Sequence, residues 1–363
     1  MDFSLTGAQQ EAARLAARVL DDDTADPWKE LARAGLLALA LPVELGGDEL
    51  GVMGTAAVAT EVGRRAVPVP ALATLMTGIL PIARWGDETL RRALLPPAAA
   101  GDLVLTAAVR EPSEPLPLAP RTTATTSTTG TAGTAGTAGT AGTVSGVKVG
   151  VPYAAQARHV LVPVSFTSAH GPETETGVVI IDPAAPGAHL TPTRSSSGAP
   201  ECTLVLDRAP VEHVLGHAGC LADLSGLAIA GACALADGAL AAALDLTTDH
   251  VAERRQFGRP LAAFQSVAQQ IADVYIASRT LHLATQAACW QLDAGAGRDA
   301  PDDISVAGYW CAREAPAAVR TCHHLHGGLG MDVSYPLYRF SALIGDLVRA
   351  LGGADYQLER LPC

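Results

Sequence analysis

Three side chains that could bind a phosphorylated ligand lie close together in the segment ERRQFGRPLAAFQ, residues 253–265. They are Arg254, Gln256 and Phe257. A guanidinium can hold a diphosphate through paired hydrogen bonds, and an aromatic ring can pack against a nucleotide. The alternative is a solvated charged segment at a helix C-terminus, where arginine also interacts favourably with the helix dipole.

A second segment, HHLHGGLGMD at residues 323–332, contains the adjacent glycines Gly327 and Gly328. Glycine lets a backbone approach a ligand because no Cβ stands in the way. Taken alone, the pair could equally be an ordinary glycine turn. The three histidines before it, His323, His324 and His326, do not suggest a metal site, because their spacing does not put three imidazoles on one helix face and carboxylates are missing nearby.

The elements that must position these residues follow a three-part pattern. Residues 1–104 have apolar residues at helical spacing, punctuated by proline and glycine. Residues 105–215 contain short β-branched runs separated by turns, which predict an antiparallel sheet or small barrel. Residues 216–363 are again helical and predict a four-helix bundle. The Thr/Ala/Gly-rich insert at residues 122–143 offers little to bury, so we expect a disordered loop there.

Within the C-terminal part, one helix is expected to place its apolar residues on a single stripe, with Gln and Asp opposite. The stripe consists of Phe264, Val267, Ala268, Ile271 and Tyr275.

Composition limits the function classes. The formal net charge of −12 argues against nucleic acid as a partner, because phosphates require a basic surface. The first twenty residues lack a signal-peptide pattern, and we expect no membrane span. Seven cysteines, an odd number with no CxxC pair, indicate reduced thiols in a cytoplasmic protein without a zinc site.

Four motifs in the same order make the whole chain resemble the acyl-CoA dehydrogenase family. They are LPVELGGDELGV, LVLDRAPVEHVLG, ERRQFGRPL followed by Phe264-Gln265, and HGGLGMDVSYPLYRF. The resemblance implies an α+β fold: an N-terminal helical domain, a middle antiparallel β domain and a C-terminal four-helix bundle. It also implies FAD as cofactor, an acyl-CoA substrate and electron-transfer flavoprotein as electron acceptor.

In that family the two C-terminal signatures hold the pyrophosphate and adenosine of an FAD whose ring lies in a neighbouring subunit. Carried over by position, the resemblance assigns this role to Arg254, Gln256, Phe257, His324, Gly327 and Gly328. His324 stands where the family usually has glutamine.

The catalytic glutamate of the family is missing at both of its known positions. Removing a proton α to a thioester requires a carboxylate, while the flavin takes hydride from the β carbon. The residues that occupy the two positions are Ala228 and the group Gly352, Gly353 and Ala354. The nearby acids Asp223 and Asp355 are expected to cap a helix or face solvent.

The part of the family site that binds the flavin ring is also altered. The stretch REPSEPLPLAP, residues 110–120, lacks the Gly-Ser-Asp element of the family. Gly146 and Lys148 are retained, but residues 150–152 are Gly-Val-Pro where the family has an aromatic residue, isoleucine and a hydroxyl residue.

Together these features predict a non-catalytic subunit, resembling those of heteromeric (α2β2) actinobacterial steroid-type acyl-CoA dehydrogenases. A homologous partner subunit would supply the catalytic glutamate, and this chain alone would be inactive. Two alternatives remain open: an active homotetramer with a displaced carboxylate, and a flavin-free CoA-binding or scaffolding protein.

Overall fold

The computed structural model describes residues 3–22, 24–126, 142–167, 175–295 and 302–361. The chain forms two compact units. One combines residues 22–55 with 69–228, and the other combines residues 1–21, 56–68 and 229–363. The units join segments that are far apart in sequence, and the three domain boundaries expected from the sequence stay a prediction.

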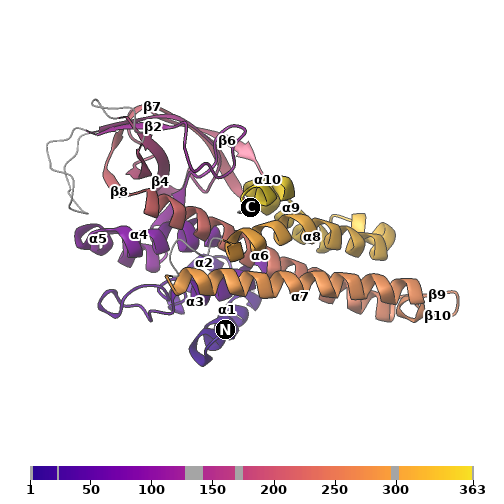
Figure 1. Ribbon diagram of the computed structural model, residues 1–363. Coiled ribbons are helices and arrows are strands. Elements are labelled where there is room, and N and C mark those ends of the chain that lie inside the picture. Colours follow the sequence, from indigo (N-terminus) through magenta and orange to yellow (C-terminus); the bar gives the residue numbers. More distant parts are fainter. Residues whose placement is uncertain (1–2, 23, 127–141, 168–174, 296–301, 362–363) are drawn as a thin grey trace. The chain divides into compact units, whose positions relative to one another are not determined.

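The first unit contains an eight-stranded sheet and short helices (Figure 1). The helices are α2 (Pro27–Arg33), η1 (Val43–Leu45), η2 (Ala71–Ile79), α4 (Leu80–Trp85) and α5 (Glu88–Ala99). The strands are β1 (Val104–Ala107), β2 (Thr123–Thr126), β3 (Gly142–Pro152), β4 (Ala157–Phe166), β5 (Glu175–Ile181), β6 (Ala188–Arg194), β7 (Pro200–Val211) and β8 (His213–His217).

The strand order is β6-β7-β3-β2-β4-β5-β8, with β1 also paired to β4. Most neighbours are antiparallel, as expected, but β4 pairs in parallel with both β1 and β2. Residues Val160 to Val164 of β4 are all buried. A strand covered on both faces has a continuous apolar run rather than an alternating pattern, which explains the sequence HVLVPVSF.

The ends of the Thr/Ala/Gly-rich insert form strands, which corrects the expectation of a loop over residues 122–143. Thr123–Thr126 of β2 pairs with residues 142–145 of β3. Threonine is β-branched and suits a pleated surface, so this part of the insert can extend the sheet. Residues 127–141 lie outside the described part of the chain.

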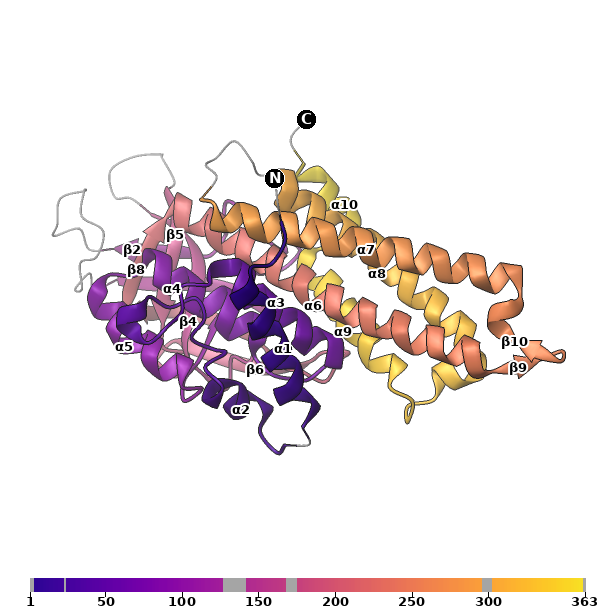
Figure 2. The same ribbon diagram turned by 90° about the horizontal axis from the view of Figure 1, so that it is seen from below.

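The second unit is helical. Its elements are α1 (Gly7–Asp21), α3 (Gly51–Arg65), α6 (Ala218–Glu253), α7 (Gln265–Asp293), α8 (Asp302–His326), α9 (Leu337–Leu351) and α10 (Gly353–Glu359), with η3 (Leu261–Ala263), η4 (Gly327–Met331) and the short strands β9 (Arg255–Gln256) and β10 (Arg259–Pro260). The first residues of α3 and α6 belong to the other unit. Figure 2 shows α6 and α7 running alongside each other to the β9–β10 hairpin.

Helix α6 is long and apolar enough to cross a membrane, but 89% of its most apolar window is buried inside the protein. Its alanines and glycines allow close packing against α3. A Cβ on Gly238 would lie 1.9 Å from the carbonyl oxygen of Thr60, and a Cβ on Gly63 would lie 2.1 Å from that of Leu235. Helix α6 is therefore the central core helix of this unit.

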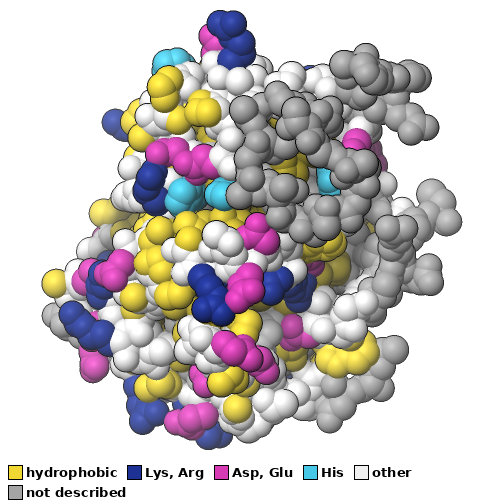
Figure 3. All heavy atoms as spheres, turned by 90° about the vertical axis from the view of Figure 1, so that its left-hand side faces the viewer, with side chains coloured by type: hydrophobic (Ala, Val, Ile, Leu, Met, Phe, Trp, Pro, Cys, Tyr) yellow, Lys and Arg dark blue, Asp and Glu magenta, His cyan; other side chains and the backbone are white. Residues whose placement is uncertain are grey.

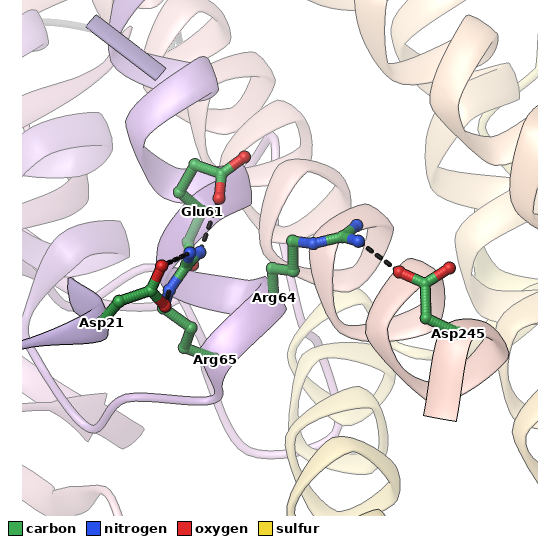
Figure 4. Close-up of polar contacts among 5 residues, drawn as sticks. All are labelled: Asp21, Glu61, Arg64, Arg65 and Asp245. Carbon is green, nitrogen blue, oxygen red and sulfur yellow. Dashed lines mark hydrogen bonds and ion pairs between the residues drawn. The ribbon is translucent and has the colours of Figure 1, made fainter. Parts of the chain in front are cut away.

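Ion pairs lie around the C-terminal end of α3 (Figure 4). Arg65 donates to the Asp21 carboxylate at 2.7 and 2.9 Å and to Glu61 at 2.6 Å, while Arg64 pairs with Asp245. The guanidinium of Arg65 lowers the pKa of Asp21 through its hydrogen bond. These contacts tie α1 and α6 to the last turn of α3.

The apolar stripe expected on α7 differs from the buried face in the structure. The buried residues begin at Val274 and continue through Ser278 and Leu281. Tyr275 is 55% exposed and its neighbour Ile276 is 61% exposed. The first half of α7 therefore carries apolar side chains that the described part of this chain does not cover.

On the face shown in Figure 3, Lys and Arg side chains are interspersed with Asp and Glu side chains, and hydrophobic side chains lie among them. The acidic side chains visible on this face are thus mixed with basic ones rather than gathered in one acidic patch.

Candidate functional site

The first signature folds into a hairpin directly after α6. Gln256 pairs with Arg259, and Arg255 pairs with Pro260. Phe257 and Gly258 form the turn with φ of +52° and +80°. Two-residue hairpins prefer turns with positive φ at both central residues. The amide of Leu261 donates to the carbonyl of Arg254 at 2.8 Å and closes the base of the hairpin.

The hairpin presents Phe257 to solvent. This ring is 91% exposed and makes an edge contact with Phe264, with ring centroids 6.2 Å apart. The Arg259 guanidinium lies 4.0 Å from the centre of the Phe264 ring. Arg254 and Gln256 are exposed as well. An exposed aromatic ring beside exposed guanidinium groups is suited to a nucleotide and its phosphates.

The second signature forms the turn after α8. Gly327 has φ of +59°, and a Cβ at either Gly327 or Gly328 would meet no atom within 4 Å. The side of this turn is therefore open to a ligand. His324, on the last turn of α8, is also exposed.

The structure brings the two signatures to the same end of the helical unit. His250, in the last turn of α6, stacks on His326, the last residue of α8. The ring centroids are 4.4 Å apart and the planes are inclined by 18°. The open hairpin and the open turn fit the nucleotide end of an FAD, because each offers exposed donors or a Cβ-free backbone to its phosphates.

The histidines beside the turn are engaged in other interactions. His323 contacts the carbonyl of Gly330 at 2.8 Å and the hydroxyl of Ser341 at 3.0 Å. His326 contacts the carbonyl of Cys322 at 2.8 Å and the hydroxyl of Tyr335 at 3.0 Å. Within the described residues, no group of three or more His, Cys, Asp or Glu residues could hold a metal ion.

Neither position for the catalytic base offers a proton acceptor. Ala228 is buried within α6. The nearby acid Asp223 accepts from Arg84 at 2.6 Å and from the indole nitrogen of Trp85 at 2.9 Å. Asp223 is thus held in an ion pair and is only slightly exposed, which corrects our expectation of a cap or a solvated side chain.

The other position is a turn between α9 and α10. Gly352 and Gly353 have φ of +85° and +84°, a conformation that glycine adopts without steric cost. The buried side chain of Gln357 donates to the carbonyl of Leu351 at 2.5 Å and holds the turn. Asp355 is exposed, as expected.

Lys148, retained from the ring-binding half of the family site, is fully buried in an ion pair with Glu111 at 2.7 Å. The same carboxylate accepts from the amides of Arg121 and Thr122 and from the Thr122 hydroxyl. Burial lowers the pKa of Lys148 to about 8, against the opposing effect of Glu111. Burial also opposes ionisation of Glu111, but Lys148 and Thr122 outweigh it and its pKa is lowered.

The altered residues 150–152 end strand β3. Gly150 has φ of +58°, Val151 is buried, and the carbonyl of Pro152 accepts from the Thr106 hydroxyl at 2.7 Å. Sequence reasoning missed Glu111 as the partner of Lys148, although the acid stood in the REPSEP segment. A buried lysine requires a counter-charge, so a search for a nearby acid could have found it.

The fold and the two signatures define the class of this protein. The chain matches the family models described as acyl-CoA dehydrogenase, N-terminal domain, over residues 6–102 and acyl-CoA dehydrogenase, C-terminal domain, over residues 227–354. It belongs to the acyl-CoA dehydrogenase family, whose cofactor is FAD. The predicted α+β fold, with a helical N-terminal domain, a middle β domain and a helical C-terminal domain, is confirmed.

Among its relatives, the acyl-CoA dehydrogenase FadE28 of Mycobacterium tuberculosis is 41% identical, covering 99% of this chain and 98% of that protein. A solved variant of the Tcur3481-Tcur3483 steroid ACAD is 31% identical with a TM-score of 0.86, covering 99% of this chain and 97% of that one. The ChsE4-ChsE5 complex from Mycobacterium tuberculosis is 28% identical, with the same TM-score and the same coverage.

Proposed function

We propose that this chain is one subunit of a heteromeric FAD-dependent acyl-CoA dehydrogenase that introduces an α,β double bond into an acyl-CoA thioester. The observation that carries the proposal is the loss of the base. Ala228 and residues 352–354 cannot take a proton, and Asp223 is already bound by Arg84 and Trp85. A homologous partner would supply the catalytic glutamate.

The role of this chain is to bind and orient the cofactor. Arg254 and Gln256 would hold the pyrophosphate with charge-assisted and neutral hydrogen bonds, and Phe257 would pack against the nucleotide. His324 would donate a hydrogen bond, and the Cβ-free turn at Gly327 and Gly328 would let the backbone amides approach. FAD, when bound, supplies the hydride acceptor for the reaction.

The uncovered face of α7 supports assembly with a second chain. Tyr275, Ile276 and Leu283 are more than half exposed on this one helix. Exposed apolar groups of this kind are typical of surfaces that bind another protein. A homologous subunit could bury them against its own helices and so complete the helical core.

The similarity to a steroid ACAD supports a steroid side-chain CoA thioester as the substrate. In an α2β2 assembly only two of the four chains would carry the base, so the assembly would contain fewer active centres than chains and leave room for a bulky acyl group. We propose electron-transfer flavoprotein as the electron acceptor and a cytoplasmic location, both carried over from the family and the reduced cysteines.

Co-expression tests this proposal. The chain purified alone should be colourless or weakly yellow and should not oxidise acyl-CoA with an artificial electron acceptor. Co-expressed with a homologue that retains the glutamate, it should give a yellow, active complex. The matched control is the same complex with the partner's glutamate changed to glutamine, which should stay yellow and lose turnover.

Two other results would replace the proposal. Turnover by rigorously partner-free protein would indicate an active homotetramer with a displaced carboxylate. Colourless protein, both when the chain is purified alone and when it is co-expressed with the homologue, would indicate a flavin-free CoA-binding or scaffolding protein.

A further inference from the structure

Two stacked histidine rings link the segments that carry the flavin signatures. His250 belongs to the last turn of α6, and its carbonyl accepts from the amide of Arg254 at 2.8 Å. His326 ends α8 and immediately precedes Gly327. The two rings stack with their centroids 4.4 Å apart, so the stack directly connects the two segments.

The ring of His326 is fixed by both of its nitrogens. A carbonyl oxygen can only accept, so Nδ1 must carry the hydrogen that it donates to Cys322 at 2.8 Å. Nε2 of the neutral ring then accepts from the Tyr335 hydroxyl at 3.0 Å. Only 5% of His326 is exposed. The ring is thus a fixed platform for His250.

We propose that His250 and His326 are positioning residues that hold the two flavin signatures at the separation required to bind FAD, and that they do so as neutral imidazoles. The inference rests on the proposed function, because it takes FAD as the ligand of the two signatures. It assigns no contact with FAD to either ring. Its consequence is that FAD binding weakens when the stack is protonated.

Charge and burial around the stack favour the neutral rings. Burial lowers the pKa of both histidines. Arg254 lowers the pKa of His250 further while Glu253 opposes it, and His250 and His323 lower the pKa of His326 while the carbonyls of Cys322 and Leu246 oppose it. Further titratable groups nearby are the Cys322 thiol, whose pKa is raised by burial, and Tyr335, whose pKa is raised by burial and then by the charge of Asp249.

The direction of the pH effect follows from these shifts. Histidine has an ordinary pKa of about 6.5, and a base whose pKa is lowered in the ordered state binds its proton more readily when the stack is open. The stabilisation is therefore complete above about pH 6.5 and is lost as the pH falls below it. Protonation of both His250 and His326 would place two positive charges next to each other in the stack.

The test measures FAD affinity of the co-expressed complex between pH 7.5 and 5.5. We expect the wild-type dissociation constant to rise severalfold across this range, because a protonated stack no longer holds the two segments in place. His250→Phe keeps a flat aromatic ring that cannot be protonated. Its FAD affinity should remain within about twofold of the wild-type affinity at pH 7.5, and it should change less with pH. His250→Ala removes the ring and should bind FAD weakly at every pH.

A second measurement separates this inference from the proposed function. In the FAD-free protein, the protection of amides 250–264 and 323–335 against hydrogen exchange, taken relative to the intrinsic exchange rate at each pH, should fall below pH 6.5 in the wild type but not in His250→Phe. If the complex binds no FAD yet shows this difference, the proposed function fails, whereas the pH-dependent link between the two segments through the stack stands. Identical exchange profiles, or FAD binding that tightens at low pH in the wild type, would overturn the positioning role.

Discussion

Glu111 and Lys148 form a buried ion pair with a structural role. Both side chains are essentially inaccessible to solvent, and the carboxylate accepts from three further donors besides the ammonium. A buried charge is tolerated only when it is paired and hydrogen-bonded. This pair therefore fastens the segment between β1 and β2 to strand β3.

Lys148→Met should consequently leave a buried carboxylate without its counter-charge. We expect a loss of about 3–5 kcal/mol in the free energy of unfolding, measured by urea denaturation. The double variant Glu111→Gln with Lys148→Met should recover part of this loss. Arg92→Ala, which removes only the exposed pair with Glu88, should change stability by less than about 1 kcal/mol. A loss for Lys148→Met as small as that for Arg92→Ala would contradict the structural role.

The sequence predicted individual site residues where a motif identified them. It did not predict interaction partners that are distant along the chain and come together only in the fold. It identified Lys148 from its Gly-x-Lys motif, but Glu111 lies 37 residues away along the chain. It likewise assigned Asp223 to a cap or to solvent, because Arg84 and Trp85 come from helix α4, 139 and 138 residues earlier.

At the scale of elements, the crossing of α3 and α6 depends on two glycines. Each would place a Cβ about 2 Å from a carbonyl oxygen of the other helix, and neither helix backbone can move away cheaply. Close packing of this kind transmits even small volume changes as strain.

Gly238→Ala should therefore destabilise the protein by about 1–3 kcal/mol, the usual range for overpacking. The matched control is Gly345→Ala in helix α9, where a Cβ would meet no atom within 4 Å. Alanine is the better helix former, so this control should stabilise the protein by up to about 1 kcal/mol. Thermal melting of both variants at equal concentration measures the difference, and equal shifts in the same direction would refute the close contact.

Periodicity predicted the elements better than the faces they bury. The helical runs, the strands of the middle region and the apolar stripe on α7 were found from their spacing, whereas the buried face of α7 was not. Tyr275 lies on that stripe but is 55% exposed. Spacing identifies an apolar face of a helix but does not indicate whether this chain or another chain covers that face. The threonines of β2 were missed because low-complexity composition hides their β propensity.

At the scale of the whole molecule, assembly and cofactor binding rely on different groups. The exposed apolar residues of α7 are suited to subunit association, whereas the hairpin after α6 presents guanidinium groups and a single ring. Apolar burial supplies most association energy, and charge-assisted hydrogen bonds supply orientation. The two functions should therefore be separable by mutation.

Arg254→Ala should weaken FAD binding without dissociating the complex. Losing a charge-assisted hydrogen bond typically costs about 1.5–3 kcal/mol, which corresponds to roughly a ten- to hundredfold weaker affinity. After gel filtration of the diluted complex, flavin absorbance per complex should fall while both chains still co-elute. The control, Arg14→Ala, removes an exposed arginine that pairs with Glu11 on α1 and should retain flavin. Full retention of FAD by the Arg254→Ala complex would mean that the hairpin is a relic, and the scaffolding alternative would then become the better account of this chain.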